Sequence, residues 1–205
     1  KIRNMKTISI SNINLASQLL KEEYIIAFPT ETVFGLGIIY DSERAFEHLA
    51  EVKRRRPDKP FTLMCADIYD IGNYAVINER AKRLIAHFLP GELTIVLNIK
   101  PGLPQWVDFG TGHIGIRVPD DEIVRKMIRL VGKPLLVPSA NRADQRPLTT
   151  SDEVISEFGD EIGGVVLGRS KGATPSTVIA AYDKITMLRE GKISLADITK
   201  VLGGD

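Results

Sequence analysis

The sequence has little of what a secreted or membrane-embedded protein needs. It contains one cysteine, Cys65, so no disulfide can form within the chain, which is typical of a reducing compartment. No apolar run approaches the roughly 20 residues that a membrane-spanning helix requires. Residues 1–7 are polar where a signal peptide would have an apolar core. We therefore expect a cytoplasmic protein without membrane contact, with Cys65 as a small core residue.

Residues that commonly act as nucleophiles or metal ligands are also scarce. The three histidines, His48, His87 and His113, lack metal-site spacing, and no G-x-S-x-G elbow is present. Gly110–Gly115 matches G-x-G-x-x-G by letter, but it leads into an apolar strand-like segment and opens no helix, which excludes a dinucleotide site. We predict no metal held by protein side chains and a reaction that needs no protein nucleophile.

What the chain does contain fits one globular α/β domain over residues 1–205. The composition is 43% hydrophobic and 26% charged, which is ordinary for a protein with a buried core. Short apolar segments such as Tyr24–Phe28 and Leu93–Ile99 alternate with helical patterns such as residues 43–53, which indicates an α/β fold. The net charge of +1 gives no whole-molecule attraction to nucleic acid, so any such binding must come from a local patch.

Polar residues mark where several of the expected helices begin. A side-chain oxygen that accepts from a backbone N–H of the first helical turn stabilises a helix start. The expected caps are Asn12 or Asn14, Asn78, Asp120 or Asp121, Thr150 with Glu153, and Ser194 with Asp197.

One local patch is the stretch Lys53–Lys59, in which five of seven residues are basic. It follows the expected helix over residues 43–53, and cations near a helix C-terminus complement its macrodipole. One or two cations would meet that need, so the others suggest a docking site for a phosphate chain or nucleic acid. From charge alone, a solvated helix end and an anion site both stay open.

A second pattern is a set of polar loops that follow apolar strands and carry hydroxyls, an amide and arginines. The first is a loop expected over Pro29–Gly37, where the two glycines permit backbone that other residues resist. Its polar residues, Thr30, Glu31 and Thr32, could form a ligand site or a hydroxyl-bonded turn. The hydroxyl pairs are Thr30 with Thr32, and Ser176 with Thr177; Ser139 and Asn141 form a third polar pair. Arg117 and Arg189 fall within or at the end of expected strands, where a buried arginine needs a partner. Structural ion pairs would explain each arginine alone. Together with the basic stretch, the set suggests a cavity for an anionic ligand, and reactions of phosphate esters depend mainly on positioning and electrostatics.

Seven motifs then occur in one order along the chain. They are PTETVFGLG (Pro29–Gly37), Lys53-x-Arg55, PGELT (Pro90–Thr94), GIRVP (Gly115–Pro119), PSAN (Pro138–Asn141), STV (Ser176–Val178) and LREG (Leu188–Gly191). In this combination the chain closely resembles the YrdC-type threonylcarbamoyl-AMP synthase family, from about Ala27 to Ile193.

The resemblance implies a twisted, mostly mixed sheet with flanking helices and a concave basic cavity. It implies condensation of L-threonine, bicarbonate and ATP, with Mg²⁺ accompanying ATP, to threonylcarbamoyl-AMP and pyrophosphate. The product would serve the modification of adenosine 37 in tRNA, through transfer proteins that act downstream.

The resemblance also implies roles for individual residues. Lys53 and Arg55 would be catalytic and hold the triphosphate. The residues expected to bind ATP are Lys53, Arg55, Lys59, Ser139, Asn141 and Arg189. Those expected around threonine are Thr30, Thr32, Arg117 and Ser176.

Some positions depart from the family pattern. Many members have Asn where Lys59 stands, and some have His where Met64 stands. The segment Phe61–Cys65 (FTLMC) is similar to the YciO branch of the superfamily. The alternative function is therefore a YciO-like protein that binds structured RNA with the basic cavity, with an affinity that falls steeply with salt.

Overall fold

The computed structural model describes residues 4–56 and 60–203 of the chain. Its strands are β1 (Lys6–Ile8), β2 (Ile26–Phe28), β3 (Gly35–Ile39), β4 (Leu63–Met64), β5 (Leu93–Asn98), β6 (His113–Arg117), β7 (Leu135–Leu136), β8 (Gly164–Val166), β9 (Thr177–Ala180) and β10 (Thr186–Arg189). Its α-helices are α1 (Ile13–Lys21), α2 (Glu43–Lys53), α3 (Glu79–Phe88), α4 (Gln105–Asp108), α5 (Glu122–Val131), α6 (Ser151–Phe158) and α7 (Leu195–Leu202). Short 3-10 helices are η1 (Ile10–Asn12), η2 (Ile68–Asn73) and η3 (Gly159–Glu161).

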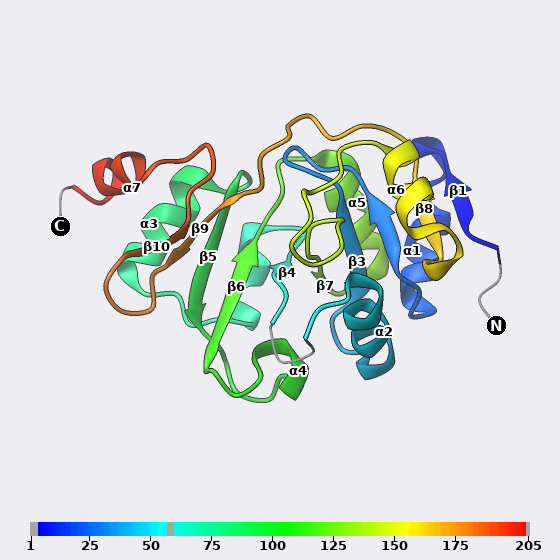
Figure 1. Cartoon of the computed structure of the whole chain (residues 1–205). Helices are drawn as coiled ribbons and strands as arrows, with labels where there is room; N and C mark the ends of the chain where they lie inside the picture. Colours follow the sequence, from blue (N-terminus) through cyan, green and yellow to red (C-terminus); the bar gives the residue numbers. More distant parts are fainter. Residues whose placement is uncertain (1–3, 57–59, 204–205) are drawn as a thin grey trace.

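The ten strands of the described residues form one sheet in the order β1-β8-β2-β3-β7-β4-β6-β5-β9-β10. The sheet is mixed: β4 with β6 and β5 with β9 are parallel, whereas β3 with β7 and β5 with β6 are antiparallel. It crosses the molecule from β1 at one end to β10 at the other (Figure 1). The expectation of an α/β fold with a mixed sheet is confirmed.

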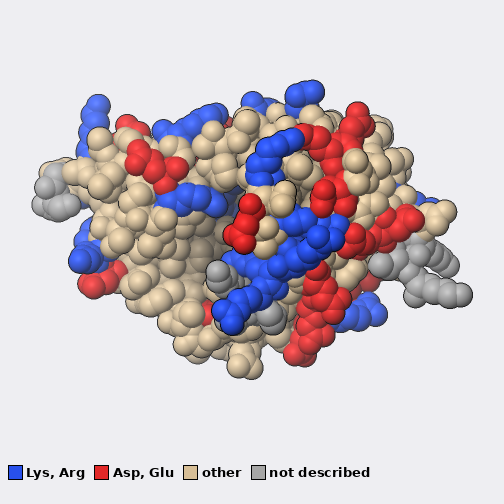
Figure 2. Space-filling view, viewed as in Figure 1, with Lys and Arg blue, Asp and Glu red and all other residues tan. Residues whose placement is uncertain are grey.

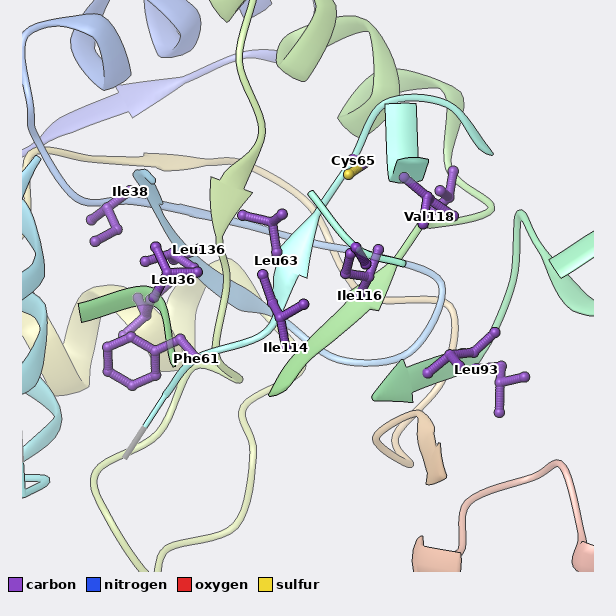
Figure 3. Close-up of a cluster of buried hydrophobic side chains, with 14 of the residues drawn as sticks. Leu36, Ile38, Phe61, Leu63, Cys65, Leu93, Ile114, Ile116, Val118 and Leu136 are labelled. Atoms are coloured by element: carbon purple, nitrogen blue, oxygen red, sulfur yellow. The ribbon is translucent and has the colours of Figure 1, made fainter. Parts of the chain in front are cut away.

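Helices cover both faces of this sheet, and the alternation of side chains along β2 follows from that. Ile26 and Phe28 pack on the face that carries α1 and α5, whereas Ala27 points into the cluster that includes α2 and α6. The cluster that includes α2 and α6 extends across the central strands (Figure 3). Cys65 lies within it and is 1% exposed, as expected for a core residue.

Four of the predicted helix caps are confirmed, whereas Asn12 occupies the cap position of α1 without a capping hydrogen bond from its side chain. Asn78 accepts from the backbone N–H of Ala81, and Asp121, not Asp120, caps α5. Both predicted capping boxes form, at the starts of α6 and α7. None of the helices in the described residues has the length and apolar character needed to cross a bilayer.

The loop predicted over Pro29–Gly37 is too long, because its last three residues belong to strand β3. Gly35 and Gly37 have ordinary extended backbone; what they supply is space. A Cβ on Gly37 would lie 2.6 Å from Cε1 of Phe28, and one on Gly35 would lie 2.6 Å from Cγ1 of Val137. The two glycines thus leave room for the side chains of Phe28 and Val137 to pack closely on strand β3. The expected reason for glycine at these positions, backbone freedom, does not apply. The connection between β5 and β6 contains the short helix α4.

Candidate active site

A polar cavity of about 210 Å³ lies over the central strands of the sheet. Figure 2 shows a hollow near the middle of this face, bordered by lysine or arginine side chains. Seven of the residues predicted to bind ligand line the cavity: Thr30, Thr32, Arg55, Arg117, Ser139, Ser176 and Arg189. The structure therefore brings together segments up to 159 residues apart, from Thr30 to Arg189.

The wall after strand β2 is built from the two threonines of the first motif. The hydroxyl oxygens of Thr30 and Thr32 lie 3.0 Å apart, and Thr30 donates a 2.7 Å hydrogen bond to the carbonyl of Val33. The Thr30 oxygen also accepts from the Thr32 backbone N–H at 3.1 Å. Both side chains are buried, and these bonds fix the loop conformation, as predicted for a hydroxyl-bonded turn.

Arg117 ends strand β6 and pairs with Glu31 of the same loop. Its Nη1 donates to the Thr32 hydroxyl at 3.1 Å, and its Nε donates to the carbonyl of Gly91 at 3.1 Å. Burial, with a further contribution from the charge of Arg189, lowers the pKa of Arg117 to about 9. The guanidinium is still charged at neutral pH, and Glu31 balances that charge inside the protein.

Arg189 ends strand β10 and contacts Ser176 at the start of β9. Its Nε donates to the Ser176 carbonyl at 3.0 Å, and its Nη2 donates to the Ser176 hydroxyl at 3.2 Å. The same hydroxyl lies 2.8 Å from the Oγ1 of Thr94. Burial lowers the pKa of Arg189, but no acidic side chain of the described residues is paired with it in an ion pair. Arg189 is thus a cation on the cavity wall with only neutral acceptors.

Arg55 reaches the cavity from beyond the C-terminal end of α2. Its guanidinium lies over the Phe61 ring, 5.0 Å from the ring centroid, and its Nη2 donates to the carbonyl of Pro60 at 3.3 Å. Ring stacking of this kind fixes the plane of a guanidinium. Arg55, Arg117 and Arg189 thus all line the cavity, with the charge of Arg117 balanced by Glu31 and Arg189 bonded to neutral acceptors among the described residues.

Lys53 and Asn141 do not line the cavity; they bind each other behind it. Lys53 is 3% exposed, and its Nζ donates to the Ser139 carbonyl at 2.6 Å and to the Asn141 carbonyl at 3.0 Å. The Asn141 side chain accepts from Lys53 at 2.7 Å and from the Ser139 hydroxyl at 3.0 Å. Burial, aided by the charge of Arg55, lowers the pKa of Lys53 to about 7. Lys59 lies outside the described residues.

Sequence reasoning missed two polar members of the site. Thr94, in the PGELT motif, is 2% exposed and lines the cavity, but no ligand role had been predicted for it. Glu31 was noted only as a polar residue of the loop, and nothing in the sequence pairs it with Arg117. A strand expected at Leu93 could have indicated Thr94, since the next residue along a strand points to the opposite face. The described residues contain no group of three or more His, Cys, Asp or Glu placed to hold a metal ion.

The fold and this site define an α/β protein whose arginine-lined cavity is assembled from loops and strand ends. A family model described as Telomere recombination, for Sua5, YciO and YrdC, matches residues 18–191. The chain belongs to this Sua5/YciO/YrdC family.

Individual relatives cover most of the chain. It is 36% identical over 192 residues to a protein of Bacillus subtilis named threonylcarbamoyl-AMP synthase, covering 92% of this chain and 56% of that protein. A solved structure of P. abyssi Sua5 complexed with L-threonine has a TM-score of 0.91 at 31% identity, covering 98% of this chain and 62% of that one. E. coli YciO shares the fold, with a TM-score of 0.88 at 22% identity, covering 95% of this chain and 99% of that one. The chain thus spans little more than half the length of the two longer relatives.

Proposed function

We propose that this chain is an L-threonylcarbamoyladenylate synthase, a nucleotidyltransferase that condenses L-threonine, bicarbonate and ATP to threonylcarbamoyl-AMP and pyrophosphate. The name of the Bacillus relative and the threonine bound to the Pyrococcus relative support this function. Within the proposal, residues 1–205 act as one domain, and the product serves tRNA modification through other proteins.

The observation that carries the proposal is the placement of three arginines and several hydroxyls around one cavity. Every reactant of this synthesis is anionic or zwitterionic: the triphosphate, the bicarbonate and the carboxylate of threonine. Guanidinium groups bind carboxylate and phosphate oxygens with two parallel hydrogen bonds. Among the described residues the cavity lining has fixed cations but no cysteine, histidine or carboxylate that could serve as or activate a nucleophile, which suits a reaction carried by positioning and electrostatics.

The two chemical steps balance without a covalent enzyme intermediate. The threonine amine bonds to the carbon of bicarbonate, and water leaves as the carbamate forms. If bicarbonate first takes up a proton and loses water to give carbon dioxide, the amine bonds to that carbon and releases a proton. A carbamate oxygen then bonds to the α-phosphorus of ATP, while the bond to the bridging oxygen of the β-phosphate breaks and pyrophosphate leaves. Mg²⁺ enters bound to the ATP phosphates and offsets their charge.

The residues divide between the two substrates by their position on the cavity wall. Thr30, Thr32 and Arg117 form the wall that we assign to threonine, and Ser176 completes it beside Thr94. We assign the phosphates to Arg55, Ser139 and Arg189. Arg189 suits this role because its acceptors on the protein are neutral, so its positive charge is available to an anion.

Lys53 and Asn141 have a supporting place in this proposal. Their mutual hydrogen bond and the two carbonyl bonds of Lys53 shape the loop that carries Ser139. Direct contact of Lys53, Asn141 or Lys59 with ATP stays a prediction. In the proposal, Lys53 and Asn141 influence the reaction by holding Ser139 in position or by binding ATP directly.

A pyrophosphate assay tests the function. Purified protein is incubated with ATP, Mg²⁺, bicarbonate and L-threonine, and the mixed anhydride is identified by mass spectrometry. We expect pyrophosphate release that requires both threonine and bicarbonate. Serine and other amino acids in place of threonine test the identity of the amine. Folded protein that releases no threonine-dependent pyrophosphate would contradict the proposal.

A further inference from the structure

Arg142 is a buried arginine that lies behind the cavity and not on its wall. It directly follows Asn141 and is 6% exposed. A buried guanidinium is costly unless its N–H groups are paired. All of its nitrogens donate within the protein, so its role depends on the segments of the chain that it connects.

One of its partners is the end of helix α2. Nη1 of Arg142 donates to the carbonyl of Val52, the residue before Lys53. The backbone N–H of Ala143 donates to the carbonyl of Lys53 at 2.8 Å. The last four carbonyls of a helix have no partner inside the helix, and a cation there also complements the helix dipole. Residues 142 and 143 therefore supply the end of α2 with the donors that it needs.

The same junction is bound in the opposite direction by Lys53. Its Nζ donates to the carbonyls of Ser139 and Asn141, which are part of the segment that contains Arg142. Each segment thus sends one buried cation to backbone carbonyls of the other. Lys53 and Ser139 are 86 residues apart in the sequence. The segment after Lys53 places Arg55 at the cavity, and the other segment places Ser139 there.

The other partners of Arg142 anchor this junction to α6 and η3. Nε donates to the carboxylate of Glu157 at 2.8 Å, and Nη2 donates to the Glu157 carbonyl at 2.9 Å. Glu161 accepts two bonds, from Nη1 at 3.1 Å and from Nη2 at 2.7 Å. The guanidinium carbon lies 4.6 Å from the centroid of the Phe158 ring. Hydrogen bonding to Glu161 is the largest cause that raises the pKa of Arg142. The bidentate pair holds the guanidinium in one plane.

We infer that Arg142 is a positioning residue for nucleotide binding: it fixes the spacing between the segment that carries Arg55 and the segment that carries Ser139. This inference rests on the proposed function for the identity of the nucleotide, ATP. Threonine binding should be much less affected, because Thr32, Arg117 and Ser176 come from other segments of the chain and have no hydrogen bond with Arg142 among the described residues.

Two variants separate positioning from stability. Arg142→Met removes every bond to Val52 and to the glutamates. We expect it to raise the KM for ATP by roughly tenfold to hundredfold, as displaced binding groups do, while the KM for threonine changes little. The double variant Glu157→Gln/Glu161→Gln is the matched control, since it removes the two carboxylate charges and leaves the Val52 carbonyl available to Arg142. We expect it to lower Tm but to leave the KM for ATP near the wild-type value.

Rescue and direct binding complete the test. Arg142→Lys keeps a cation that can reach the Val52 carbonyl and should restore ATP binding in part. Calorimetric titration with ATP and Mg²⁺ measures nucleotide affinity without turnover. A wild-type protein that binds ATP but releases no pyrophosphate would contradict the proposed function and leave the role of Arg142 to be decided by these titrations. Equal ATP affinity of folded Arg142→Met and wild type would overturn the inference. The inference would also be overturned if the double glutamine variant, which has a lower Tm but keeps the bond from Arg142 to Val52, showed a rise in the KM for ATP as large as that of Arg142→Met.

Discussion

The ammonium of Lys53 lies 2.7 Å from the side-chain oxygen of Asn141 and joins the end of helix α2 to the loop after strand β7. Two backbone carbonyls complete the surroundings of this ammonium, and the charge of Arg55 lies nearby. Lys53 is therefore a buried cation whose partners are neutral, and its protonation is linked to the stability of the junction behind the cavity.

The pH dependence of stability should reveal Lys53. Its pKa in the folded protein is about 7, below its value of about 10.4 in an unfolded chain. Between these values the unfolded state binds a proton that the folded state lacks, so the free energy of unfolding rises with pH. In urea unfolding from pH 7 to 9.5, the free energy of unfolding of wild type should rise relative to that of Lys53→Met by up to about 1.4 kcal/mol per pH unit. Lys126→Met, at an exposed position of α5, is the control. Parallel curves for wild type and Lys53→Met would contradict the shifted pKa.

Arg55→Ala and Arg189→Ala should each weaken ATP binding with little loss of stability. Each variant removes a charged hydrogen-bond donor from the cavity wall, and such bonds contribute about 1.5–3 kcal/mol. We expect the Kd for ATP to rise by at least about tenfold, since 1.4 kcal/mol is a factor of ten. Calorimetric titration measures the affinity, and thermal unfolding measures the stability. Arg56→Ala, at an exposed position beyond α2, is the matched control. Titration curves that match wild type for both cavity variants would refute the phosphate assignment.

Arg117→Met should unfold the protein more easily by about 3–5 kcal/mol, because it leaves the Glu31 carboxylate buried without its partner. Adding Glu31→Gln to that variant should restore part of the loss, since the uncompensated charge disappears. A double-mutant cycle by urea unfolding measures the coupling between the two residues. Strictly additive losses would show that the ion pair has no energetic importance.

Gly37→Ala should destabilise the fold by about 1–3 kcal/mol, the usual effect of an added methyl group in a packed core. The new Cβ would lie 2.6 Å from the ring of Phe28, and the ring is fully buried. Phe28→Leu in the same background frees space and should recover part of the loss. Gly72→Ala is the control without crowding, because its backbone φ is not positive and the nearest atom to a new Cβ, Cδ1 of Ile77, lies 3.7 Å away. A Gly37→Ala variant as stable as wild type would show that Phe28 or strand β3 shifts enough to accommodate the added methyl group.

Local patterns predicted the helices and most strands because their signals lie within a few residues. Asn78 and the pair Thr150 and Glu153 mark helix starts through contacts that span three residues. The cavity was harder to predict. Ligand residues were expected after strands, and Thr30 and Ser139 follow β2 and β7, but Ser176 lies immediately before β9. Because the sheet is mixed, strand starts and strand ends meet over the same surface.

The direction of a long side chain was beyond the reach of sequence. Lys53 and Arg55 are two residues apart, and family resemblance assigned both to the triphosphate. Helix α2 ends between them, with Arg54 in the left-handed region at a φ of 52°. That turn directs Lys53 inward to Asn141 and Arg55 to the cavity. The burial of Glu31 against Arg117 is a tertiary pairing of the same kind.

The position of β10 next to β9, at the far end of the sheet, has a consequence for synthesis on the ribosome. Arg189 reaches the cavity from the last strand of the described residues, whereas Thr30 follows the second. Domains generally fold as units. Because the cavity needs both of these segments, a nascent chain cannot hold a complete cavity before Arg189 has emerged from the ribosome. Ligand binding can therefore stabilise the fold only after translation has passed Arg189.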